Sequence, residues 1–195
     1  MPRLTTRHPP RWRVRSGARR GAFTVVESAL IVCVVGALLA VATPTFLRTV
    51  QTSKIAEAST QLAVLYRASA SYYATPRTGE AGTHAFCLAA AAGPTPETPS
   101  VNPVPVDFGA DETAGSVTWR ALGFAPQTPL RYRYTFAPTK AGCALPTPGT
   151  GVLVLRAEGD LDGDGVLSSF ERSASIQVAG ELSPDPLLRV RDRIE

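Results

Sequence analysis

The sequence predicts an α+β protein in which one long N-terminal helix packs on a small antiparallel β-sheet head. Three observations predict this class. An apolar run of 25 residues lies near the N-terminus, an amphipathic helical pattern follows it directly, and strand signals occupy much of the remaining chain. The 195 residues leave room for one domain of ordinary size plus an extension.

Positive charge is concentrated before the apolar run. The formal net charge is +4, but seven arginines and no acidic residue precede Phe23. Without these seven, 13 basic residues stand against 16 acidic ones, a balance of 13 − 16 = −3. Nucleic acid is therefore not an expected partner, because a nucleic-acid-binding domain carries its basic residues on its folded part. A basic segment before an apolar run is typical of export.

Residues 23–47 carry a single charge, at Glu27. A helix of this length spans roughly 37 Å, which exceeds the ~30 Å hydrocarbon core of a bilayer. The segment is therefore predicted to cross a membrane. A carboxylate inside lipid costs a few kcal/mol, so Glu27 is expected to have a partner in the working state. Cys33 is interpreted as a small apolar residue of this helix.

The stretch RRGAFTVVESALIVCVVGALLAVATPTF resembles the N-terminus of type IV prepilins and the related pseudopilins. Those proteins have a basic leader, a small residue before the cleavage point, and then a Phe, a Thr and, four residues after the Phe, a Glu. Phe23, Thr24 and Glu27 match this pattern. The family usually has a Gly thirteen and a Pro twenty-one residues after the Phe, where Gly36 and Pro44 stand.

The resemblance implies that a prepilin peptidase removes residues 1–22 and that Phe23 becomes the methylated N-terminus. The family prefers Gly directly before the Phe, whereas here Gly21 is followed by Ala22. Cleavage after Gly21 would move three matching positions out of frame together, namely Glu27, Gly36 and Pro44. We therefore expect cleavage between Ala22 and Phe23. The leader is long for the family, which a misassigned start codon would explain.

The resemblance also implies how subunits assemble. The Phe23 ammonium would lie near the membrane surface and pair with Glu27 of a neighbouring subunit, while Gly36 and Pro44 permit a local kink. The expected partners are other pilin subunits, the prepilin peptidase, the pilus assembly machinery and the inner membrane. The chain would be a minor pilin, single-pass in the inner membrane before assembly and part of a surface or periplasmic filament afterwards.

Two alternatives share parts of this pattern. A type II secretion pseudopilin has the same kind of N-terminus and belongs to different machinery. A secreted calcium-binding domain would instead have a signal peptide cut after Ala42, following the small residues at 40–42 and the arginine pair at 19–20. Glu27 is unusual in such a signal, and the apolar character continues past Ala42.

Residues 48–75 continue the helical pattern with an apolar stripe, and Pro76 is expected to end it. The stripe consists of Ile55, Ala58, Leu62, Leu65 and Tyr72. Its spacing predicts that this half packs against a head, residues 76–181, which gives the ladle shape of pilins.

Within the head, five prolines at residues 93–105 predict an extended surface loop. Strands are predicted at residues 116–124, 130–136, 151–157 and 173–178, as a four-stranded meander over the helix. In the second of these, the apolar side chains alternate with arginines, which predicts a buried face and a solvated face. The tail, residues 182–195, is either an edge strand or disordered.

Cys87 and Cys143 are expected to form a disulfide outside the cytoplasm, which would stabilise the fold by about 4 kcal/mol in the loop-closure model. His84 is the one histidine after Phe23, and no G-x-S-x-G motif occurs. A nucleophilic triad therefore has no support, and no enzymatic activity is expected.

An acidic loop at residues 160–171 has the residue pattern of an EF-hand calcium loop. Carboxylates stand at its first, third, fifth and twelfth positions, and a Gly at its sixth. The flanks are predicted strands rather than helices, so a structural Ca2+ is expected rather than a signalling switch. The alternative is an acidic, Gly-rich hairpin connection that binds nothing. The candidate ligands are Asp160, Asp162, Asp164, the Val166 carbonyl, Ser168 through water, and Glu171.

Overall fold

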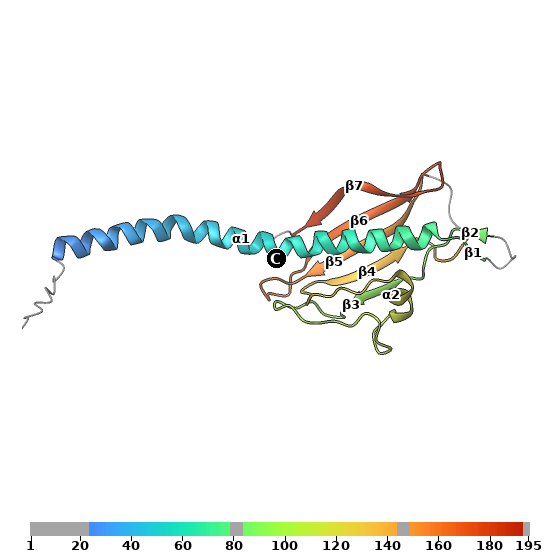
Figure 1. Cartoon of the computed structure of the whole chain (residues 1–195), viewed down its shortest axis with the longest axis horizontal. Coiled ribbons are helices and arrows are strands. Elements are labelled where there is room, and N and C mark those ends of the chain that lie inside the picture. Colours follow the sequence, from blue (N-terminus) through green and yellow to red (C-terminus); the bar gives the residue numbers. More distant parts are fainter. Residues whose placement is uncertain (1–23, 79–83, 144–148, 193–195) are drawn as a thin grey trace, which may run out of the picture. The chain divides into compact units, whose positions relative to one another are not determined.

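The computed structural model describes residues 24–78, 84–143 and 149–192, in two compact units that comprise residues 1–45 and 46–195 (Figure 1). The predicted cleavage residues Gly21, Ala22 and Phe23 lie outside the described residues. The fold is α+β, with an apolar N-terminal helix and a five-stranded antiparallel sheet.

Helix α1 spans Val25–Ala74. Thr24 caps its N-terminus, since the Thr24 hydroxyl oxygen accepts the backbone N–H of Glu27 at 3.2 Å. Thr75 and Pro76 follow its last residue, where the residue before a proline disfavours helix. Within the first unit, Val25–Thr43 has a mean hydropathy of 2.6 and no buried residue. This stretch is long and apolar enough to cross a membrane, a property that signal sequences share.

In the second unit, each strand of the main sheet pairs with its neighbour in the chain, in the order β3-β4-β5-β6-β7. All four pairs are antiparallel. The strands are β3 (Ala92–Thr95), β4 (Arg133–Pro138), β5 (Gly151–Gly159), β6 (Ser168–Ile176) and β7 (Leu182–Arg191). Two short strands, β1 (Arg77–Thr78) and β2 (His84–Ala85), form a separate pair.

The core of the second unit lies between the C-terminal half of α1 and one face of this sheet (Figure 1). Three residues of the predicted stripe are fully buried, namely Ala58, Leu62 and Leu65. Tyr134 and Phe136 of β4 are also fully buried, as the period-two pattern predicts. The aromatic side chains of Phe108, Trp119 and Phe124 extend this core beside β4.

Residues 116–124 do not form the predicted strand; Ser116–Leu122 is helix α2. Valine, threonine and tryptophan favour strands, but the buried residues Thr118, Trp119 and Leu122 follow helical spacing. The helix ends at Gly123, whose left-handed backbone lets its N–H bond to the Arg120 carbonyl at 3.1 Å.

The sheet has five strands rather than the four expected. Part of the proline-rich stretch predicted to be a loop forms the edge strand β3, which tolerates Pro94 because an edge strand need not donate every N–H. Of the two possibilities for the tail, the edge strand is found, as β7. The strand predicted at 130–136 begins at Arg133, and that predicted at 173–178 is displaced to Ser168–Ile176.

Candidate functional site

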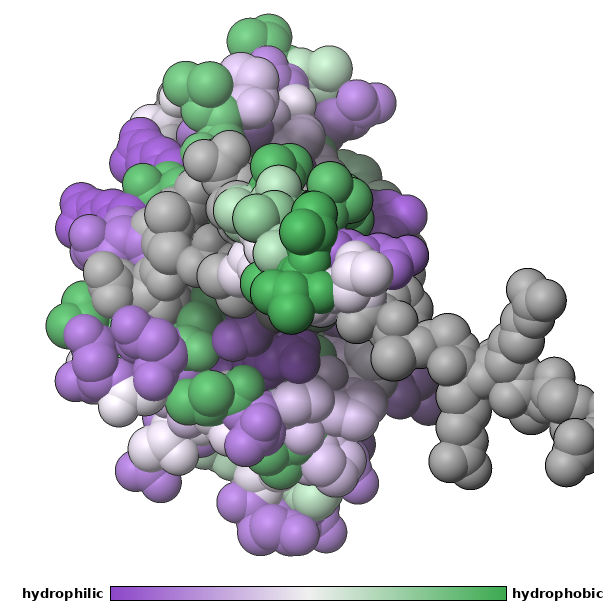
Figure 2. Space-filling view, turned by 90° about the vertical axis from the view of Figure 1, so that its left-hand side faces the viewer, coloured by the Kyte–Doolittle hydropathy of each residue, from purple (hydrophilic) through white to green (hydrophobic). Residues whose placement is uncertain are grey.

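The apolar part of α1 exposes its side chains on all sides. Val25 is 84% exposed and Val32 is 70% exposed, and apolar surface is visible in the view that faces the start of α1 (Figure 2). Glu27 lies in the first turn of this helix. No atom of the described chain lies within 4 Å of where a Cβ on Gly36 would stand, so packing inside the unit does not explain a glycine there.

The acidic loop brings together the three aspartates that the sequence singled out. One carboxylate oxygen from each of Asp160, Asp162 and Asp164 lies within 4.8 Å of the others. The carboxylates also accept backbone N–H groups. Asp160 accepts from Gly163 at 2.6 Å and from Gly165 at 3.2 Å. The loop is therefore shaped by carboxylate-to-backbone hydrogen bonds, which turns rich in Asp commonly use.

Other residues attach the loop to the head. The Leu161 side chain is buried, and the Ser168 hydroxyl donates to the Gly159 carbonyl at 3.0 Å. Lys54 of α1 donates from Nζ to the Leu161 carbonyl at 3.1 Å. The contact of Lys54 was not predicted, because 107 residues separate it from Leu161 and no local pattern links them.

Glu171, the twelfth position of the loop pattern, lies in β6 and not with the aspartates in the loop. Its carboxylate pairs with Arg156 at 3.2 Å and with Arg189 at 3.7 Å. The donor set of the three aspartates suits a hard cation such as Ca2+. The glutamate would have to leave two arginines to join that set.

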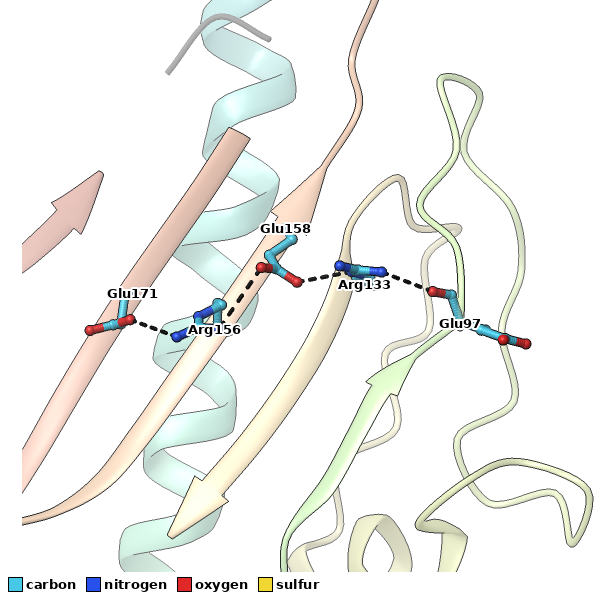
Figure 3. A network of polar contacts seen from close by, with 5 residues as sticks. All are labelled: Glu97, Arg133, Arg156, Glu158 and Glu171. Atoms are coloured by element: carbon cyan, nitrogen blue, oxygen red, sulfur yellow. Dashed lines mark hydrogen bonds and ion pairs between the residues drawn. The ribbon is translucent and has the colours of Figure 1, made fainter. Parts of the chain in front are cut away.

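These ion pairs belong to a row of charges across the outer face of the sheet, which we call the outer-face row (Figure 3). Arg133 pairs with Glu158 at 2.9 Å, and Arg156 lies 3.9 Å from Glu158. At one end Arg133 donates to the Glu97 backbone carbonyl at 3.2 Å, and at the other Arg189 reaches Glu171. Opposite charges on neighbouring strands stabilise a sheet modestly, by about 0.2–1 kcal/mol per pair.

A further carboxylate, Glu57 of α1, joins the helix to the start of β4. It accepts the backbone N–H of Arg131 at 2.7 Å and pairs with the Arg131 guanidinium at 3.4 Å. Beside it lie two fully buried tyrosines. Burial raises the pKa of the Tyr132 hydroxyl to about 12 and also raises that of Tyr134.

The structure joins Cys87 to Cys143, which confirms the predicted disulfide. Beside it, Leu88 and Gly142 exchange two backbone hydrogen bonds, Leu88 N–H to Gly142 at 3.0 Å and Gly142 N–H to Leu88 at 2.8 Å. Backbone pairing and the covalent bond therefore hold the same two segments together.

Comparison with known proteins gives no further assignment: the chain matches no family model, no curated protein and no solved structure.

Proposed function

We propose that this chain is a structural subunit, a minor pilin, of a type IV pilus-like filament. The observation that carries the proposal is the exposed apolar helix Val25–Thr43, which has Glu27 in its first turn, directly after the predicted cleavage point. An apolar surface of this extent is stable only in lipid or against other apolar helices. A filament core built of such helices supplies the second environment.

Assembly would depend on one charge pair. Removal of the leader creates an ammonium at Phe23, and Glu27 of an incoming subunit pairs with the Phe23 ammonium of its neighbour. A carboxylate in an apolar surrounding is costly alone but acceptable when it is paired. The pair would therefore fix the axial register of each new subunit, while the unobstructed position at Gly36 leaves room for a neighbouring helix.

Mass spectrometry of the N-terminal peptide of the mature, membrane-derived protein tests this function. We expect a methylated Phe23 terminus. A terminus at Thr43 would overturn the proposal and leave a secreted domain behind a signal peptide. Glu27→Gln should still be processed but should no longer enter filaments, whereas Ser28→Ala, its neighbour on the same turn, should do both.

Location of the processed chain separates the two kinds of filament. We expect it in sheared extracellular filaments, as for a pilin. Retention in the envelope, with a methylated Phe23, would instead favour a type II secretion pseudopilin.

Calcium binding by the acidic loop is a separate proposal, which rests on the residue pattern at 160–171 and not on the closeness of exposed aspartates. Asp160, Asp162 and Asp164 would hold the ion and so tie the β5–β6 connection. About 1 mM Ca2+ should then raise the melting temperature of the full chain, by an affinity in the range of extracellular calcium modules. The double variant Asp162→Asn, Asp164→Asn should abolish this rise, and Mg2+ should not produce it. An equal rise in the variant would refute the proposal.

A further inference from the structure

The two edges of the main sheet differ in how they are protected. Edge strands expose unpaired N–H and C=O groups, which another strand can use. β3 is only four residues long, contains Pro94 and is followed directly by Pro96, and proline has no N–H to offer. β7 is ten residues long, and its prolines, Pro184 and Pro186, lie in its first half.

Residues 187–191, which we call the open edge, contain no proline. They pair with β6 on one side only, in a regular register that joins Arg189 to Glu171 and Val190 to Phe170. In such a pairing, alternate residues turn their backbone groups away from the partner strand. Among the described residues, no strand pairs with the far side of the open edge. Leu187, at its start, is 75% exposed.

Charge at the open edge has one sign. The outer-face row alternates between acidic and basic side chains and ends on Arg189, which is 74% exposed and only 3.7 Å from its partner Glu171. Arg191 follows on the same face, opposite Ser169, and forms no ion pair within residues 24–192 as far as they are described. A cavity of about 320 Å3 lies on this face beside both arginines. A strand that continued the alternation would present carboxylates here.

The inward side of the open edge is apolar. Leu188 packs partly against the core, and Val190 stands opposite the buried Phe170. An added strand would therefore need apolar side chains on its inner face and acidic ones on its outer face. A second copy of β7 does not fit, because an antiparallel pair of open edges would bring four arginines together. The β3 edge of another copy does not fit either, because its prolines cannot donate.

We propose that the open edge of β7 accepts an extended segment of another protein that alternates acidic and apolar side chains. Main-chain hydrogen bonds would give affinity, and the two arginines would select the partner, as in β-strand addition generally. The identification of that protein as another filament subunit rests on the proposed function; the strand addition itself does not.

Peptide binding to the full chain in detergent micelles tests the proposal. The probe is a short fluorescein-labelled peptide of alternating glutamate and valine, with the lysine and valine peptide as its comparison, followed by fluorescence anisotropy. We expect binding of the glutamate peptide in preference to the lysine peptide. The double variant Arg189→Glu, Arg191→Glu should weaken glutamate-peptide binding about tenfold or more and reverse the preference. The control Arg67→Glu, Lys140→Glu makes the same charge change at exposed positions elsewhere and should change neither.

A third peptide separates strand addition from simple charge attraction. It keeps the glutamates and valines but carries N-methyl groups on alternate backbone amides along one side, so it cannot complete a ladder. We expect its binding to be lost. Equal binding of the methylated peptide, absence of binding by the glutamate peptide, or unchanged binding by the charge-reversed edge would each overturn the proposal. Since none of these measurements depends on cleavage at Phe23, failure here and failure of the filament proposal are distinguishable.

Discussion

At the scale of single residues, Glu57 is the polar link between α1 and the sheet. It is the acceptor for the Arg131 backbone N–H, and its side chain is only 12% exposed. Glu57→Ala should lower the free energy of unfolding by about 1–3 kcal/mol, because a half-buried N–H and guanidinium lose their acceptor. Glu57→Gln keeps one acceptor oxygen and should cost less. Denaturant unfolding followed by near-ultraviolet circular dichroism measures both, with the exposed Glu112→Ala as an unaffected control.

Two buried tyrosines predict how stability changes at alkaline pH. Burial raises the pKa of Tyr132 from 10.0 to about 12 and also raises that of Tyr134. Below pH 10 both hydroxyls are protonated in the folded and the unfolded chain, so stability is fully present. Between pH 10 and 12 the unfolded chain releases protons that the folded chain retains, so stability should fall as pH rises.

Tyr134→Phe tests this pH dependence. Among the described residues, the Tyr134 hydroxyl has no hydrogen-bond partner, so the substitution should change stability little at pH 8. At pH 11 the variant should retain more of its stability than the unchanged chain, as measured by denaturant unfolding at each pH. An equal loss in both proteins would show that other groups cause the alkaline effect.

At the scale of elements, two glycines flank α2 with similar left-handed backbones, φ 77° at Gly115 and 69° at Gly123. An alanine Cβ at Gly115 would lie 2.7 Å from the Ala92 Cβ, whereas at Gly123 it would meet nothing within 4 Å. Gly123→Ala should therefore cost only the backbone strain, about 1 kcal/mol. Gly115→Ala should cost roughly 1–3 kcal/mol more, because β3 must move. Paired unfolding measurements on the two variants give the difference directly.

The elements also show where sequence patterns suffice. Strong periodicity over many residues predicted the stripe on α1 and the buried face of β4 correctly. Prediction failed at residues 116–124, where strand-forming residue types occupy a helix whose ends are set by Gly115 and Gly123. It also missed β3, because proline argues against a central strand and the sequence does not reveal which strand will be an edge.

The candidate site was predicted unevenly for a related reason. Asp160, Asp162 and Asp164 are close in sequence, so their proximity follows from one turn. The positions of Glu171 between two arginines and of Lys54 on the loop depend on strand pairing and on helix packing between distant segments. Such contacts leave no local signal.

At the scale of the whole molecule, the disulfide joins residues 56 apart in the chain. Cross-linking a loop of this length should stabilise the fold by about 4 kcal/mol in the chain-entropy model. The double variant Cys87→Ser, Cys143→Ser should lose about this much while keeping its near-ultraviolet spectrum, since Leu88 and Gly142 still pair beside it. Unfolding of the unchanged chain with and without a thiol reductant is the independent check.

The order of the sheet has a consequence for biosynthesis. Because each strand pairs with the one made just before it, the sheet can grow in step with the ribosome and needs no long-range threading. Both cysteines have been made while 195 − 143 = 52 residues are still to come. At about 5–20 residues per second, that interval is roughly 3–10 s. β3, α2 and β4 can thus be covalently enclosed before β5 arrives, and β7, the strand with the unprotected edge, is the last to be exposed to other chains.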